Sequence, residues 1–141
     1  MLQGWEHVSF RQGFQYVNQS CKTVTINSRM PVNRAGHTAV STGSEALVCG
    51  GLKTNGGDEP VLVGDGKDLE CWWFTPLPYP RFDPLLLESG SPIPSARWGH
   101  TMSDDPKRGP VLLFGGSANA QVFNDCWFLN LSGATHCACP Q

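Results

Sequence analysis

Two arginines and two histidines recur at one fixed spacing, and they are the side chains best placed to do chemistry. The strings PVNRAGHT (31–38) and PSARWGHT (94–101) share Pro, Arg, Gly, His and Thr at the same positions. An arginine can bind a carboxylate through two parallel hydrogen bonds. Alternatively, it can bond the carbonyls of a tight loop as a structural residue. The repeated string thus predicts either acidic-group recognition or a structural role for Arg34 and Arg97.

The two histidines, His37 and His100, lack the companions that catalysis requires. A histidine base needs a nucleophile or a metal beside it, and the sequence contains no G-x-S-x-G, H-E-x-x-H or complete phosphate-binding loop. We expect each histidine to bond backbone groups through both ring nitrogens. The short cluster His136, Cys137 and Cys139 does not match a four-ligand zinc site. We therefore expect no catalytic residues, no metal, no cofactor and no enzyme activity.

The bulk composition is that of one globular domain. The chain has 141 residues, 40% of them hydrophobic and 16% charged, which excludes a disordered chain. Ten Lys and Arg against 12 Asp and Glu leave no basic excess for a nucleic acid. No apolar run reaches the roughly 20 residues of a membrane helix, and no signal peptide is visible. We expect a cytoplasmic or nuclear protein that binds neither nucleic acid nor membrane.

Short strands must position the repeated string, because no window of 11 or more residues shows a helical apolar period. After each histidine come a short strand, a polar turn, a hydrophobic strand and a glycine pair. An aromatic strand follows, LECWWFTPL (69–77) or NDCWFLNL (124–131), and the first copy adds RFDPLLLES (81–89). The sequence therefore predicts an all-β fold built from two copies of a four-stranded antiparallel unit.

Cysteines and a loop insertion distinguish the two copies. Cys49, Cys71 and Cys126 lie in apolar strand-like strings, and we expect them to be free, buried, reduced thiols. The first copy carries ten extra residues within the loop 52–68. In that loop, Asp65-Gly66 is expected to turn the chain between a strand at 61–63 and the strand from residue 69.

In this order the features resemble the kelch repeat: R-x-G-H, a hydrophobic strand closed by Gly-Gly, then an aromatic strand introduced by Asn-Asp. The resemblance covers residues 31–131, with Leu69-Glu70 in place of Asn-Asp in the first copy. It implies kelch-type β-propeller blades, each a four-stranded antiparallel sheet. Propellers typically have about 4 to 8 blades around a channel, so two blades make an incomplete propeller.

The resemblance also implies a division of the chain. We expect residues 1–30 to be outer strands of a preceding blade or an irregular N-terminal segment. Residues 31–93 are then the first repeat with the inserted loop 52–68, and residues 94–141 the second, truncated at its fourth strand. Because blades bury their faces against neighbours, we expect further blades from the same parent chain or another subunit. The residues expected to form the structural motif are His37, His100, Gly50, Gly51, Gly115, Gly116, Trp72 and Trp127.

The function that the resemblance implies is protein binding, in a scaffold or adaptor role, through the loop face of the propeller. Trp98 replaces Ala35 of the first copy and is expected to be an exposed aromatic anchor. The loops after each glycine pair are expected on the same face, where binding function concentrates. Two alternatives are an accessory propeller of a larger enzyme and a truncated product without independent function. The residues expected to contact a partner protein or peptide are Arg34, Arg97, Trp98, Lys53, Asn55, Ser117 and Asn119.

Overall fold

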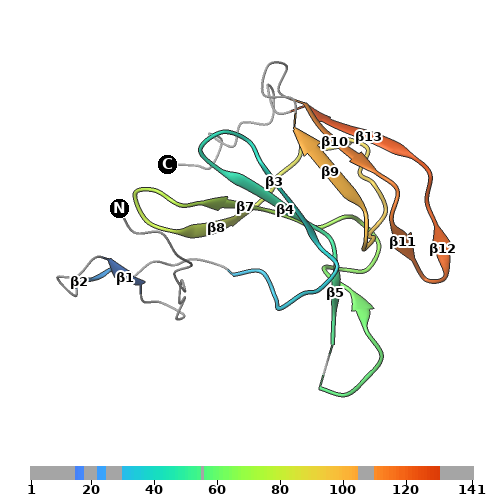
Figure 1. Cartoon of the computed structure of the whole chain (residues 1–141), viewed down its shortest axis with the longest axis horizontal. Coiled ribbons are helices and arrows are strands. Elements are labelled where there is room, and N and C mark those ends of the chain that lie inside the picture. Colours follow the sequence, from blue (N-terminus) through green and yellow to red (C-terminus); the bar gives the residue numbers. More distant parts are fainter. Residues whose placement is uncertain (1–14, 18–21, 25–29, 55, 105–109, 131–141) are drawn as a thin grey trace, which may run out of the picture.

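The computed structural model of the chain describes residues 15–17, 22–24, 30–54, 56–104 and 110–130 (Figure 1). These residues form antiparallel strands and no helix, which confirms the predicted all-β class. It follows that they contribute no helix with the length and hydrophobicity needed to span a bilayer. Within the segment 1–30, β1 (Gln15–Val17) pairs with β2 (Lys22–Val24). Asn55, the remainder of 1–29 and residues 131–141, with His136, Cys137 and Cys139, lie outside the described residues.

The first large sheet contains four strands in sequence order. They are β3 (Thr38–Ser41), β4 (Ala46–Cys49), β7 (Cys71–Thr75) and β8 (Arg81–Pro84). A tight turn joins the first two, in which the Thr42 amide donates to the Glu45 carbonyl oxygen over 2.9 Å. Along β4 the side chains alternate: Leu47 and Cys49 are buried, whereas Ala46 and Val48 are half-buried. The sheet therefore presents one face to a protein core.

The second large sheet repeats the first three strands. It contains β9 (Thr101–Asp104), β10 (Pro110–Phe114) and β13 (Cys126–Asn130), in the order β13-β10-β9. The first strands of the two sheets, β3 and β9, lie side by side, and the sheets diverge from there (Figure 1). A counterpart of β8 would follow residue 130 and so falls outside the described part of the chain.

A small hairpin follows each glycine pair. The first contains β5 (Leu52–Lys53) and β6 (Val61–Leu62), and the second contains β11 (Ser117–Ala118) and β12 (Gln121–Val122). Residues 54–60 join β5 to β6, whereas only residues 119–120 join β11 to β12. Both hairpins extend away from the large sheets at one end of the molecule (Figure 1). Half of the ten-residue insertion therefore lengthens the tip of the first hairpin.

The other half of the insertion joins the two repeats. Residues 63–70 separate β6 from β7, and Asp68 forms an isolated bridge with Ser95. The Ala96 amide donates to the Lys67 carbonyl oxygen over 2.8 Å. The predicted hairpin around Asp65-Gly66 is wrong, because β6 pairs with β5 and both edges of β7 are occupied by β4 and β8. Asp65 instead accepts the amides of residues 67 and 68 through Oδ1 and closes a local turn.

The core lies between the two large sheets. Leu47, Cys49 and Trp73 of the first sheet are buried there, and Val111 and Leu113 of the second sheet are buried as well. Burial of such side chains stabilises a fold by about 1.5–3 kcal/mol each. The surrounding half-buried residues are Val40, Leu69, Cys71, Leu85, Met102 and Leu129.

The cysteine prediction is wrong in two respects. Cys49 and Cys71 form a disulfide, because the register of β4 with β7 places them directly opposite each other. In the second sheet the equivalent pair is Phe114 and Cys126, so Cys126 has no cysteine opposite it and is free. Its side chain is exposed and not buried, because it points away from the first sheet.

Candidate functional site

Arg97 is held by a closed set of acceptors at the base of the second sheet. Its Nε donates to the Ser95 carbonyl oxygen (3.0 Å) and its Nη1 to the Gly115 carbonyl oxygen (2.9 Å). Both terminal nitrogens donate to the Asp125 carboxylate, over 2.6 and 3.0 Å. The guanidinium carbon lies 4.1 Å from the centre of the Phe123 ring. Only 1% of Arg97 is exposed, so its donors are used inside the chain.

Arg34 has the same arrangement in the first sheet. Its Nε donates to the Val32 carbonyl oxygen (3.2 Å), and its Nη1 to the Gly50 carbonyl oxygen (3.2 Å). Its Nη2 donates to Glu70 Oε1 over 2.6 Å, and the arginine side chain is buried. Glu70 and Asp125 therefore occupy equivalent positions, although one is a glutamate and the other an aspartate.

Each carboxylate also accepts the indole N–H of a tryptophan. Trp72 donates to Glu70 over 2.7 Å, and Trp127 donates to Asp125 over 2.7 Å. A half-buried indole N–H needs such a partner, which accounts for the recurrence of these tryptophans. The hydrogen bond from Arg97 is the main cause that lowers the pKa of Asp125 to about 2, and the bond from Trp127 adds to it.

Glu70 and Asp125 were not among the site residues predicted from the sequence. A signal was available, because each lies two residues before its tryptophan in an equivalent strand. The contacts fit the structural alternative for the two arginines, since a partner carboxylate would have to displace Asp125 to reach the guanidinium of Arg97. Their contact with a partner stays a prediction.

His100 differs from the expected backbone-bonded histidine. Its ring is buried, and neither ring nitrogen has a hydrogen-bond partner among the described residues, so the expectation is wrong at this position. Burial, with smaller effects of Arg97 and His37, lowers the pKa of His100 to about 4. The ring packs against Gly50 instead: a Cβ there would lie 2.7 Å from His100 Cε1 and clash with the Arg97 carbonyl oxygen. His37, by contrast, is exposed.

Trp98 lies at the base of the second hairpin and is 40% exposed. Its backbone is fixed by two hydrogen bonds with Ser117, one in each direction, over 3.0 and 2.8 Å. Its ring lies against Gly36, where a Cβ would be 3.4 Å from Cε3. In the first repeat Ala35 forms the same two bonds with Leu52, over 2.9 and 2.8 Å. The anchor predicted from the sequence is thus exposed and held in place by both repeats.

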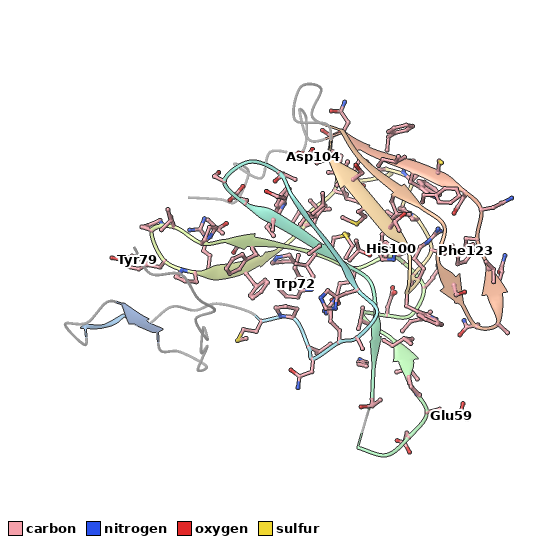
Figure 2. The ribbon with its side chains drawn as sticks, viewed as in Figure 1. Glu59, Trp72, Tyr79, His100, Asp104 and Phe123 are labelled. Atoms are coloured by element: carbon pink, nitrogen blue, oxygen red, sulfur yellow. A yellow bond between two sulfur atoms is a disulfide. The ribbon has the colours of Figure 1, made fainter. Side chains whose placement is uncertain are left out.

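The remaining predicted contact residues lie on the hairpins. Lys53 and Ser117 are half-buried, whereas Asn119 is exposed in the turn with a φ of +47°. The connection between β5 and β6 carries Glu59 at its far end, on the opposite side of the molecule from Tyr79 (Figure 2). Two valines on the hairpins, Val61 and Val122, are also exposed. We call Trp98, Gly36 and the two hairpins (52–63 and 117–123) the loop face.

An apolar cavity of about 540 Å³ lies elsewhere, between the two large sheets. Its lining includes Trp73, Leu85 and Leu129, and it contains none of the residues predicted to contact a partner. Within the described ranges no group of three or more His, Cys, Asp or Glu is placed to hold a metal ion.

No protein-family model matches the chain, and no curated protein matches its sequence.

Proposed function

We propose that this chain forms kelch-type propeller blades and is a protein-binding module that takes a partner protein or peptide on the loop face. The blade assignment is supported by the two similar sheets and by the repeated arginine–carboxylate–tryptophan contacts. The binding role is one of recognition and not of catalysis, as in a scaffold or adaptor.

The exposure of Trp98 is the observation that carries the proposal. Tryptophan is enriched among the few interface residues that dominate affinity. An anchor whose backbone is already fixed loses little conformational freedom on binding, and Trp98 is fixed by Ser117 and packed on Gly36. The exposed Val61 and Val122 add apolar surface to the hairpins of the same face.

A peptide-display selection on the full chain tests the proposal. Peptides that bind the wild type are measured against Trp98→Ala and against Tyr79→Ala. Tyr79 is 38% exposed and lies in the β7–β8 turn, away from the loop face (Figure 2), so it is a matched control for loss of an exposed aromatic. We expect Trp98→Ala to weaken binding by about tenfold or more, and Tyr79→Ala to leave it unchanged.

Two outcomes would contradict the proposal. One is a selection that yields no peptide above background for the wild type. The other is a set of peptides whose affinity is insensitive to Trp98→Ala, or falls equally with Tyr79→Ala. Thermal unfolding of both variants shows whether either substitution acts through the fold.

A further inference from the structure

The packing of the two large sheets on each other defines one junction inside the chain. Besides the two bonds between residues 67–69 and 94–96, three hydrogen bonds join the repeats at this junction. The Gly51 amide donates to the Arg97 carbonyl oxygen (3.0 Å). The Gly99 amide donates to the Gly36 carbonyl oxygen (2.8 Å), and Thr38 Oγ1 to the His100 carbonyl oxygen (2.6 Å). We call this set of contacts, with the apolar core behind it, the internal junction.

The outer face of the second sheet is the one that points away from the first sheet. It carries the same kinds of residue as the face that the first sheet contributes to the internal junction. Leu112 and Phe114 precede their glycine pair by three residues and one, as the buried Leu47 and Cys49 do. Phe114 is 48% exposed, and Phe128, the counterpart of the buried Trp73, is 71% exposed. An apolar surface that is buried in one repeat is therefore open in the other.

The outer face of the first sheet, in turn, carries the same kinds of residue as the face that the second sheet contributes to the internal junction. Ala46, Val48 and Trp72 are the counterparts of Val111, Leu113 and Trp127, which face the first sheet. At the loop end of this face, His37 is exposed, whereas its counterpart His100 is buried in the internal junction.

The glycine that receives the histidine has space in its Cβ direction at the outer end, although Gly115 itself is buried. A Cβ on Gly50 would meet Arg97 and His100, but a Cβ on its counterpart Gly115 would meet only the Phe123 carbonyl oxygen, at 3.4 Å. Gly51 donates across the internal junction, while for its counterpart Gly116 no backbone acceptor occurs in the described residues. One end of the molecule thus lacks a histidine-bearing loop, and the other end presents one.

We propose that a second copy of this chain docks head to tail, with the outer face of its first sheet on the outer face of the second sheet. The contact reproduces the internal junction: His37 of one copy packs on Gly115 of the other, and Phe128 is covered. Such a heterologous contact closes into a ring if its rotation allows. If the sheets are propeller blades, as in the proposed function, two to four copies would supply the roughly 4 to 8 blades of a ring.

The mass of the full chain in solution, measured over a concentration series, tests this arrangement. We expect an oligomer of two to four copies for the wild type. Phe128→Arg should weaken the association by at least tenfold, because the arginine would be buried without a partner. Val122→Arg is the matched control: Val122 is 80% exposed but lies on the second hairpin, outside the proposed contact, and its variant should associate like the wild type.

Mixing two blocked variants tests the head-to-tail geometry. Phe128→Arg blocks one end, and His37→Glu blocks the other at an exposed position. At a concentration where the wild type is assembled, each variant alone should be largely monomeric. The mixture should form a one-to-one dimer that does not grow, because the pair uses the one unblocked end of each variant and only blocked ends remain.

A wild type that is monomeric at all concentrations would overturn the proposal. So would association that survives Phe128→Arg, or a mixture that stays monomeric. Circular dichroism and thermal unfolding of each variant establish that it is folded. The outcome is independent of the Trp98 peptide experiment, since the two use different faces.

Discussion

Each large sheet is anchored by one arginine. Its side chain donates hydrogen bonds to a glycine carbonyl oxygen, to a carboxylate and to a carbonyl oxygen of its own loop. The two anchors are unequal in geometry. Arg97 makes two hydrogen bonds to the Asp125 carboxylate, whereas Arg34 makes one to Glu70. Two parallel bonds fix the orientation of a guanidinium and stabilise it more than a single bond.

We therefore expect Arg97→Lys to be more destabilising than Arg34→Lys. A lysine keeps the positive charge but cannot reproduce the fork of donors. Loss of hydrogen bonds to a charged group lowers the free energy of unfolding by about 2 kcal/mol for Arg97→Lys, and by less for Arg34→Lys. Urea unfolding followed by circular dichroism measures both values, and equal losses would contradict the inequality.

The buried ring of His100 makes stability depend on pH. In the unfolded chain the histidine takes up a proton near its ordinary pKa of 6.5, but in the folded chain only near pH 4. The unfolded state therefore binds more protons between these values. We expect the neutral ring to make its full contribution to the free energy of unfolding above pH 6.5. That contribution, about 3 kcal/mol, should be lost as the pH falls to about 4.

The matched comparison is His100→Leu, which keeps an apolar side chain in the buried position and removes the titrating group. Its free energy of unfolding, measured from pH 7 to pH 4, should fall less steeply than that of the wild type. Parallel curves for the two proteins would mean that other groups cause the acid sensitivity.

Among the elements, the ten-residue insertion within the loop 52–68 has two structural roles. Its first half lengthens the hairpin of β5 and β6, and its second half, residues 64–69, bonds to the segment that enters the second sheet. Asp65 shapes this second half by accepting two amides. A loop that the sequence marks as one feature thus belongs partly to the loop face and partly to the connection between the sheets.

Asp65→Ala should loosen that connection. We expect the amides of Leu69 and Ala96, which donate to the carbonyl oxygens of Pro94 and Lys67, to exchange with solvent on the order of tenfold faster. Nuclear magnetic resonance measures the exchange residue by residue. Asp58→Ala, in the exposed hairpin tip, is the control and should leave both rates unchanged. Unchanged rates in Asp65→Ala would contradict the assigned role.

For the whole molecule, the sequence was sufficient to predict what depends on local pattern. Apolar runs closed by glycine pairs predicted β4 and β10, and the aromatic strings predicted β7 and β13, since strand formation follows from short-range composition. The repeat of these elements predicted two similar sheets. The exposure of Trp98 was also predicted, because its counterpart in the first copy is a small residue.

What the sequence did not predict depends on register and on distant pairing. The Cys49–Cys71 disulfide requires the two cysteines to oppose each other across β4 and β7, which no local pattern specifies. The partners of the arginines are 36 and 28 residues away in the chain, so only the folded sheet brings them together. Disulfides persist mainly in oxidising compartments, so the Cys49–Cys71 bond does not favour the expected cytoplasmic or nuclear location. That location stays a prediction.

Arg97 has one further consequence, because it belongs to both repeats. Its side chain bonds Asp125 within the second sheet, while its carbonyl oxygen accepts the Gly51 amide of the first. A fragment that contains the first repeat without the second would lack that acceptor and would expose both Leu47 and Trp73. The two halves should therefore melt in a single cooperative transition, and neither half should express as an independently stable fragment.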